Sequence, residues 1–130
     1  MAKLDAVGIV VKDLARAVAF YRMLGVPFPE GAENSEDGHA EATLDGGMRL
    51  MLDVESETRK FDPSWQRGTG SPTAALAFLC DSPQAVDELY AKALAAGGKA
   101  HKAPEDQFWG QRYALLRDPD GNGVDLFAYL

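Results

Sequence analysis

The C-terminal segment of the chain places a carboxylate and aromatic rings at alternating positions. Residues 124–130 read Val-Asp-Leu-Phe-Ala-Tyr-Leu, a pattern typical of a strand. Side chains of a strand point alternately to its two faces, so Asp125, Phe127 and Tyr129 are predicted to share one face. The other face carries only apolar side chains and suits a core. The face with Asp125 combines an acid with aromatic rings, which suits the binding of a small organic molecule.

Two earlier segments also alternate polar and apolar side chains. In residues 39–44 the polar members are His39, Glu41 and Thr43, and in residues 48–54 Arg49, Met51 and Asp53 alternate with leucines. We expect His39, Glu41, Asp53 and Asp125 to orient a ligand through polar contacts. Arg49 and Arg112 are further candidate partners of the ligand, although Arg49 can instead pair with a carboxylate of a neighbouring strand.

Large aromatic side chains lie near these polar positions in the sequence. Trp109 and Tyr113 flank the start of a predicted strand, residues 112–117, and Trp65 lies in a polar segment earlier in the chain. Flat rings beside small residues suit stacking on a planar ligand. The sequence therefore predicts that Trp109 stacks on a ligand together with Trp65 or Tyr113, whereas Phe61 and Phe108 are expected to pack in the core.

Two strand–helix units form an internal repeat that must position these residues. The apolar run at residues 7–11 precedes a helical pattern that Asp13 can cap and Gly25 can end. The run at residues 74–80 precedes a second helical pattern, with Ser82 as the cap and Pro83 in the first turn.

Extended segments follow each helical pattern, so the chain reads as βαβββ twice. In the first half they are residues 26–28, 39–44 and 48–54, and in the second half residues 99–103 and the two strands around the turn at residues 118–123. The sequence thus predicts an α+β protein with one domain. Its first module covers about residues 1–54, a linker about 55–72, and the second module about 73–130.

Composition excludes several classes of function. The 130 residues carry a formal net charge of −7, which disfavours nucleic acid and anionic membranes as partners and favours a cationic or neutral small ligand. The single cysteine, Cys80, permits no internal disulfide. No apolar run approaches the length of a membrane span or a signal segment, so we expect a cytoplasmic protein.

The turn sequence Asp-Pro-Asp-Gly-Asn at residues 118–122, followed by Val124-Asp125-Leu126 and preceded by the Trp109-Gly110 pair, resembles the vicinal oxygen chelate superfamily. This group includes glyoxalases, extradiol dioxygenases, and bleomycin- and mitomycin-resistance proteins. The resemblance implies two βαβββ modules whose mixed sheets curl around a central cleft, with the helices outside. Residues 20–26, 44–50, 62–66 and the segment from Trp109 are most similar to the mitomycin-resistance type.

Metal-dependent members of this family hold their ion with four inward-facing side chains. The matching positions here are Ala6, Met51, Ala75 and Asp125, with the register at Met51 uncertain by one residue. One carboxylate is too few for a divalent transition metal. A site rebuilt from His39, Glu41, Asp53 and Asp125 is disfavoured because the chain has only two histidines. We therefore expect no metal and no other cofactor.

The resemblance and the missing ligands together favour a metal-free protein that binds a planar, antibiotic-like molecule, for sequestration and self-resistance. By analogy it would act as a homodimer, with its modules either swapped or unswapped. The alternative is a glyoxalase-like lyase or isomerase for a small carbonyl compound, either metal-independent with His39 or a carboxylate as general base, or with the rebuilt metal site. Binding rather than catalysis is favoured, and the sequence leaves the ligand open.

Overall fold

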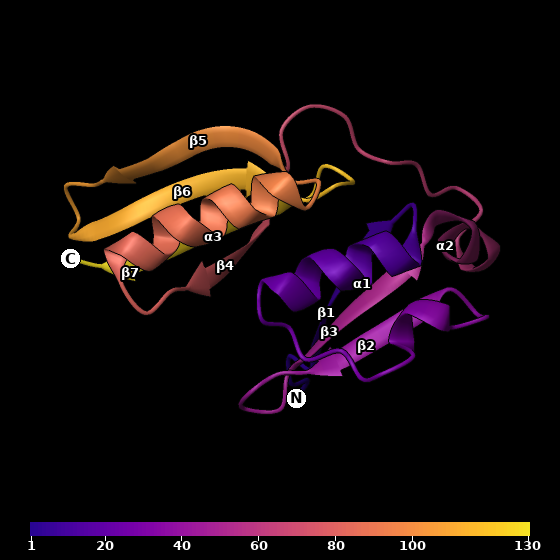
Figure 1. The fold of residues 1–130 in the computed structure, drawn as a ribbon. Coiled ribbons are helices and arrows are strands. Elements are labelled where there is room, and N and C mark those ends of the chain that lie inside the picture. Colours follow the sequence, from indigo (N-terminus) through magenta and orange to yellow (C-terminus); the bar gives the residue numbers. More distant parts are fainter. The chain divides into compact units, whose positions relative to one another are not determined.

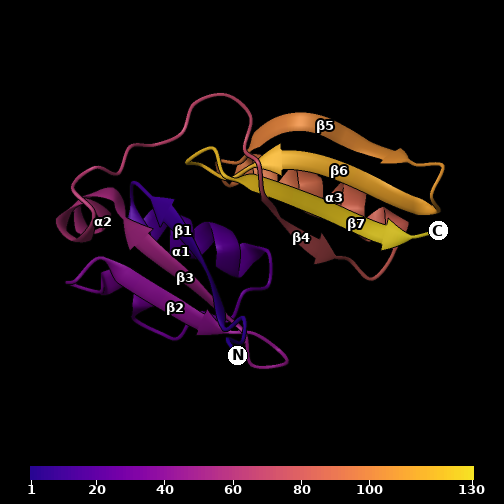
Figure 2. The same cartoon turned by 180° about the vertical axis from the view of Figure 1, so that it is seen from behind.

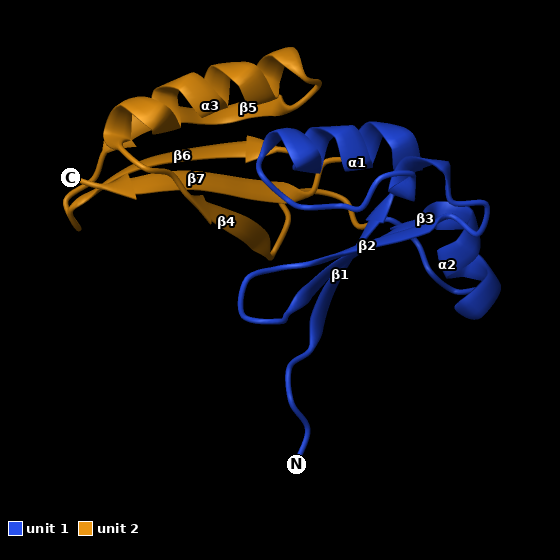
Figure 3. Ribbon diagram, turned by 60° about the horizontal axis from the view of Figure 1, so that its bottom comes forward, with its two compact units in different colours: residues 1–67 blue, residues 68–130 orange.

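The structure is a computed structural model that describes residues 1–130. The chain forms two compact units, residues 1–67 and residues 68–130, coloured separately in Figure 3. None of the helices combines the length and the apolar character that a membrane span requires.

The first unit is a three-stranded sheet with a helix on one face (Figure 1). The strand order is β1-β3-β2, where β1 runs parallel and β2 antiparallel to β3. The elements are β1 (Ala6–Val11), α1 (Leu14–Met23), the short 3-10 helix η1 (Ala32–Asn34), β2 (His39–Thr43), β3 (Arg49–Val54) and α2 (Glu55–Phe61).

Helix α1 begins and ends where the sequence predicts. The Asp13 carboxylate accepts a hydrogen bond from the Arg16 amide at 3.0 Å, and Gly25 follows the helix at φ 100°, in the left-handed region that favours glycine. The buried side of the helix includes Val18 and Tyr21, which are both fully inaccessible. Alternate residues of the two C-terminal strands of this sheet complete the core: Ala40, Ala42, Leu50 and Leu52.

The second unit is a four-stranded sheet with the order β4-β7-β6-β5. Its elements are β4 (Ala75–Leu79), α3 (Pro83–Ala95), β5 (Lys99–Asp106), β6 (Gln111–Arg117) and β7 (Gly123–Tyr129). Helix α3 lies along one face of this sheet, and the view from behind brings the other face forward (Figures 1 and 2). We call the face of each sheet that is turned away from its own helix, α1 or α3, the open face.

One buried carboxylate, that of Asp118, accepts the hydrogen bonds that hold the turn between β6 and β7. Asp118 is fully buried, and its Oδ1 accepts hydrogen bonds from the amides of Asp120 at 2.8 Å and Asn122 at 2.9 Å. The Asn122 side chain donates to the other carboxylate oxygen at 2.8 Å. A Cβ atom on Gly123 would lie 2.7 Å from the Ala74 carbonyl oxygen, so β4 can approach β7 closely only at a glycine. This turn is therefore a joint of the second sheet: it connects β6 to β7 and lets the start of β4 pack closely against β7.

The predicted α+β class with two mixed sheets is confirmed, and the elements fit two βαβββ modules. One of the predicted strands is wrong, because residues 26–28 pair with no other strand. Pro27 has no amide hydrogen to donate to a ladder, and the Phe28 amide donates to the Val26 carbonyl at 2.9 Å. Conversely, α2 was not among the predicted elements and lies inside the segment expected as a linker.

Candidate functional site

The open face of the second sheet carries a stacked pair of aromatic rings. Tyr113 of β6 lies opposite Phe127 of β7 in the antiparallel register. Their ring centroids are 5.7 Å apart and their planes differ by 20°. Both side chains are half-buried on the open face, whereas their strand neighbours Ala114 and Leu126 point to the opposite face and are buried in the core.

Further rings extend this pair in both directions. Trp109 packs edge-on against Tyr113 with centroids 5.9 Å apart, and Tyr129 packs edge-on against Phe127 at 6.0 Å. We call these four residues, Trp109, Tyr113, Phe127 and Tyr129, the aromatic row. Trp109 is 50% exposed and Tyr129 is 65% exposed. The row therefore offers aromatic surface to a molecule that approaches this unit.

Local contacts fix the orientation of the Trp109 indole. It follows β5 in the turn that leads to β6, where Gly110 adopts φ 88°. The indole Nε1 donates a hydrogen bond to Gln111 Oε1 at 2.8 Å. The polar edge of the ring is thereby satisfied, and its apolar surface is left for packing.

Asp125 stands beside the stacked pair on the same face. The Tyr113 hydroxyl donates to Asp125 Oδ2 at 2.6 Å. Burial of the phenol and this hydrogen bond to a carboxylate together raise the pKa of Tyr113 to about 12, so the proton stays on the hydroxyl at neutral pH. On the other side of Asp125, its register partner in β4 is Ala77, which is exposed together with Ala75. The surface next to the carboxylate is thus a low floor of methyl groups.

The positions that match the family's metal ligands do not suit a metal ion. Ala6 and Ala75 offer no donor atoms, Met51 offers only a thioether, and Asp125 already accepts a hydrogen bond from the Tyr113 hydroxyl. Neither unit contains a group of three or more His, Cys, Asp and Glu side chains placed to hold one ion. Catalytic zinc sites use three protein ligands, so this donor set does not fit such an ion.

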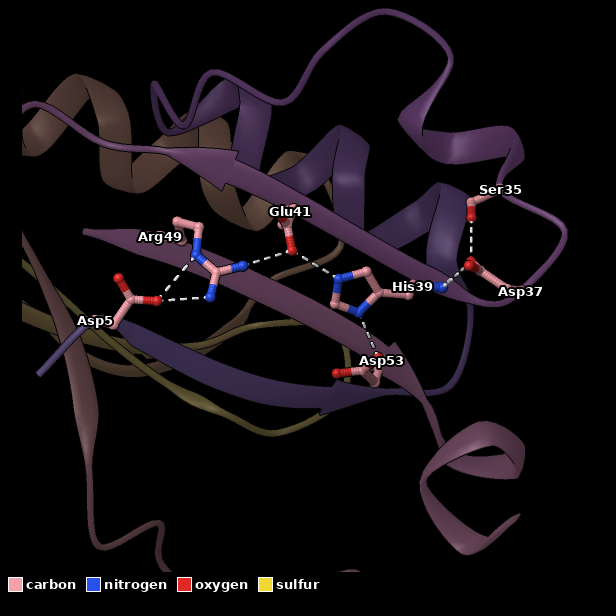
Figure 4. A network of polar contacts seen from close by, with 7 residues as sticks. All are labelled: Asp5, Ser35, Asp37, His39, Glu41, Arg49 and Asp53. Carbon is pink, nitrogen blue, oxygen red and sulfur yellow. Dashed lines mark hydrogen bonds and ion pairs between the residues drawn. The ribbon is translucent and has the colours of Figure 1, made fainter. Parts of the chain in front are cut away.

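The open face of the first sheet carries a chain of charged side chains instead (Figure 4). His39 of β2 contacts Asp53 of β3 through Nδ1 at 2.7 Å and Glu41 through Nε2 at 2.9 Å. Arg49 Nη1 donates to Glu41 Oε2 at 2.9 Å, and Arg49 also donates to Asp5 Oδ2 at 2.7 and 3.2 Å. We call these five residues the charged chain. Arg49 therefore pairs with carboxylates of its own sheet, one of the two predicted outcomes.

These contacts shift the pKa values of the groups they join. Hydrogen bonds to Glu41 and then Asp53 raise the pKa of His39, because both carboxylates favour the protonated ring. The same contact with His39, followed by that with Arg49, lowers the pKa of Glu41. Asp37 has a lowered pKa because it accepts hydrogen bonds from the Ser35 hydroxyl and the His39 amide.

Two more predicted residues take positions that their strands dictate. Met51 lies on the open face between Glu41 of β2 and Gly8 of β1, its register partners. A Cβ at Gly8 would lie 3.6 Å from the Met51 methyl group, so the thioether extends over the glycine. Arg112 turns away from the aromatic row and donates to Asp87 of α3 at 2.7 Å.

Trp65 belongs to the first unit, whereas the aromatic row belongs to the second. The guanidinium carbons of Arg59 and Arg67 lie 5.1 and 5.6 Å from the centre of its indole, as in cation–π pairs. Arg67 also donates to Glu55 at 3.1 Å and to the Val10 carbonyl at 3.1 Å. These contacts fasten the segment after α2 to the first unit, and stacking of Trp65 on a ligand stays a prediction.

The core placement expected for Phe61 and Phe108 is wrong. Phe61 is 95% exposed at the end of α2, and Phe108 is 97% exposed, with its ring edge-on to Trp109 at 5.0 Å. Phe61 is the last residue of α2, and Phe108 lies in the turn between β5 and β6, so neither ring reaches a sheet–helix core. Phe61 lines a hollow of about 430 Å³ on the first unit with Asp53, Glu57, Thr58 and Asp62.

Some residues of these faces were not predicted from the sequence. Asp5 precedes β1, but the parallel register places it near Arg49, since Ala6 is the register partner of that residue. Gln111 alternates with Tyr113 along β6, and this alternation was a signal that Gln111 shares the open face of the second sheet. No local signal marks Asp5, because its partner lies 44 residues away.

Comparison with known proteins agrees with this architecture. The sequence model of the Glyoxalase/Bleomycin resistance protein/Dioxygenase superfamily matches residues 3–126. Uncharacterized proteins of Mycobacterium bovis and Mycobacterium tuberculosis are 30% identical over 120 residues, which is 88% of this chain and 75% and 67% of theirs.

Solved structures show the same fold. A glyoxalase/bleomycin resistance protein/dioxygenase family enzyme from Burkholderia phytofirmans superposes with a TM-score of 0.82 at 25% identity, over 99% of this chain and 100% of that one. A lactoylglutathione lyase from Agrobacterium tumefaciens shares the fold at a TM-score of 0.66 and 21% identity, over 98% of this chain and 94% of that one. The chain belongs to the glyoxalase/bleomycin resistance protein/dioxygenase superfamily.

Proposed function

We propose that this protein binds a planar organic molecule on the open face of its second sheet, without a metal ion, and thereby sequesters it. The observation that carries the proposal is the aromatic row, with Tyr113 and Phe127 stacked and Trp109 half exposed. An aromatic contact contributes about 0.5–1.5 kcal/mol beyond the burial of area, so two or three such contacts support micromolar binding when area burial is added.

Charge favours a cationic or neutral ligand. Asp125 is the carboxylate beside the stacked pair, and the chain as a whole carries a net charge of −7. A ligand that lies over Ala75 and Ala77 would meet this carboxylate, which is in register with Ala77, and the Phe127 ring two residues further along β7. The family description includes bleomycin-resistance proteins, which is consistent with an antibiotic-like ligand.

Fluorescence titration tests the proposal. The variant Trp65→Phe leaves Trp109 as the only tryptophan, and we expect its emission to be quenched at micromolar concentrations by at least one of a naphthoquinone, a phenazine and mitomycin. The converse variant Trp109→Phe reports from Trp65 and should show much weaker quenching. Equal quenching of both tryptophans, or none at 100 µM of any compound, would contradict the proposal.

The second candidate function is a metal-independent lyase or isomerase. The observation that favours it is His39, a histidine held by two carboxylates on an exposed sheet face. Turnover of methylglyoxal-type carbonyl compounds by protein treated with a chelator would support this function. Retention of that turnover in a His39→Gln variant would remove His39 as its base.

We also propose that the protein forms a homodimer through one of the exposed apolar regions, with its units swapped or unswapped. Exposed Phe108, Tyr129 and Leu130 at one end of the second sheet supply apolar surface for such an association. Light scattering should give twice the mass of 14.0 kDa. A monomer at 100 µM would exclude the dimer.

A further inference from the structure

The charged chain of the first unit holds its histidine in a state that depends on one proton. Both ring nitrogens of His39 lie within hydrogen-bond distance of carboxylate oxygens, and an ionised carboxylate only accepts. Both contacts are hydrogen bonds only when Nδ1 and Nε2 each carry a proton. The arrangement in Figure 4 is therefore that of an imidazolium ring.

The two carboxylates are not equivalent partners. Glu41 Oε2 also accepts a hydrogen bond from Arg49 at 2.9 Å, whereas the contact with His39 is the one side-chain hydrogen bond of Asp53. A neutral ring has one proton to share. Leaving Asp53 without a donor costs more than leaving Glu41, which retains Arg49, so the remaining proton belongs on Nδ1.

We propose that His39 is a pH-gated base, in which Asp53 retains the Nδ1 proton while Glu41 covers Nε2 only as long as the ring is doubly protonated. When Nε2 loses its proton to solvent, its lone pair faces the Glu41 oxygen at 2.9 Å. Two acceptors at that distance repel each other. The Glu41 side chain is 43% exposed and can turn toward water and Arg49, which uncovers Nε2.

The charges around the ring set the direction of the gate. Within the charged chain one cation, Arg49, faces three acids, Asp5, Glu41 and Asp53, and Asp37 adds a further acid just before β2. On α2 and the segment after it, the acids Glu55, Glu57 and Asp62 are accompanied by the cations Arg59, Lys60 and Arg67, which pair with Glu55 and Glu57. This excess of negative charge favours the imidazolium, in line with the raised pKa of His39. Glu41 therefore covers Nε2 at low pH, and this contact is lost as the pH rises through the raised pKa of His39.

The uncovered form has the arrangement of a general base. A carboxylate on Nδ1–H holds the tautomer and the orientation of the ring, and the opposite nitrogen is then available to accept a proton from a bound molecule. The His39 side chain is 35% exposed, so a small molecule can reach it. This proposal concerns the first unit and does not depend on ligand binding at the aromatic row.

Chemical modification measures whether Nε2 is uncovered. Diethylpyrocarbonate reacts only with a neutral imidazole nitrogen, which attacks a carbonyl carbon of the reagent and displaces ethyl carbonate. Peptide mass spectrometry of the full-length protein between pH 5.5 and 9 follows His39, and exposed His101 serves as the internal reference. We expect the modification rate of His39 to rise with a midpoint above the ordinary histidine value of about 6.5.

A matched pair of variants distinguishes the effect of the Glu41 contact with His39 from the effect of removing one negative charge anywhere in the protein. Glu41→Gln removes the carboxylate that contributes most to the raised pKa of His39, so the neutral ring becomes more populated and we expect His39 to react several-fold faster at pH 7. Glu88→Gln removes the same charge from α3, where Glu88 accepts only from Gln84, and should leave the rate unchanged. A midpoint for His39 at or below about 6.5 would overturn the proposal.

Nitrogen NMR of the unaltered protein provides a second measurement that needs no variant. Above the midpoint we expect the His39 Nδ1 resonance at the position of a protonated nitrogen and the Nε2 resonance at that of an unprotonated one. The opposite tautomer would show that Glu41 rather than Asp53 retains the proton, and would contradict the proposed gate.

Discussion

The open faces of the two sheets differ in chemistry although their frameworks are alike. In each unit a helix follows the first strand and covers one face of the sheet, and the first strand pairs in parallel with the last. Alternate apolar residues of the strands are buried under the helix, and the opposite strand face is left for other side chains. The first unit fills that face with the charged chain, whereas the second fills it with the aromatic row. The framework fixes the positions, and the side chains on the open face decide what each unit can bind.

The difference extends to how each face is held together. In the second unit, ring contacts and the short Tyr113–Asp125 hydrogen bond link β6 to β7. In the first unit, Arg49 and His39 link β2, β3 and the residue before β1 through charged hydrogen bonds. Screening by salt and changes of pH should therefore act mainly on the first face, and loss of aromatic surface mainly on the second.

The largest expected effect comes from the turn that supports the aromatic row. In Asp118→Ala, three hydrogen bonds to a buried carboxylate are lost and buried donors lose their acceptor, so we expect about 3 kcal/mol less free energy of unfolding. Urea denaturation followed by Trp109 fluorescence in a Trp65→Phe background measures it. A loss below about 1 kcal/mol would show that the turn is not a joint of the second sheet.

The next largest effect concerns ligand binding at the second face. Tyr113→Ala removes one member of the stacked pair and the donor to Asp125, and we expect the dissociation constant of any quenching compound to rise about tenfold to hundredfold. Phe61→Ala is the matched control, because Phe61 is an exposed ring of the other unit. A comparable loss of affinity in both variants would mean that the aromatic row has no special role.

Most of the framework could be predicted because its signals are local. Asp13 and Ser82 cap their helices as expected, with Ser82 accepting from the Ala85 amide at 3.1 Å, and strand alternation places Ala40, Leu50 and Leu126 in the core. Helix α2 was not predicted, because its support is a set of charged pairs such as Glu55–Arg59 rather than an apolar stripe. Val26 and Phe28 read as strand from their apolar type, yet both are buried without pairing.

The sequence predicted which side chains share a sheet face better than it predicted which of those side chains contact each other. Alternation alone places His39, Glu41 and Asp53 on one side of the first sheet, and Asp125 and Phe127 on one side of the second. Which of them touch depends on strand register, for example the pairing of His39 with Asp53 and of Tyr113 with Phe127. Register is set by contacts between distant segments, so the Asp5–Arg49 pair could not be predicted from the sequence.

A pH effect of moderate size is expected for the first face alone. The pKa of His39 is raised in the folded chain, so its contribution to stability is fully present below its ordinary value of about 6.5 and is lost as the pH rises through the raised value. Because the side chain is 35% exposed, we expect a contribution of about 1 kcal/mol or less. Urea denaturation at pH 5.5 and pH 9 measures it. The free energy of unfolding should fall less between these two pH values in His39→Gln than in the wild type, because the variant lacks the His39 contribution. His101→Gln should keep the pH difference of the wild type.

The smallest effect is expected from Arg49, and it sharpens the contrast between the two faces. Arg49→Gln removes the cation between Asp5 and Glu41, two carboxylates whose side chains are 64% and 43% exposed, so we expect a loss of less than about 1 kcal/mol. The loss should shrink further in 1 M salt, where charges are screened over about 3 Å. Unfolding free energies at 0.05 and 1 M NaCl measure both effects. Gln84→Ala removes an exposed hydrogen bond from an uncharged amide to Glu88 in the second unit; it leaves every charge in place, so it is the control and should show little salt dependence. A loss for Arg49→Gln that stays the same in high salt would mean that Arg49 acts through the packing of its aliphatic stem across the sheet, and the first face would then resemble the second in being held by contact rather than by charge.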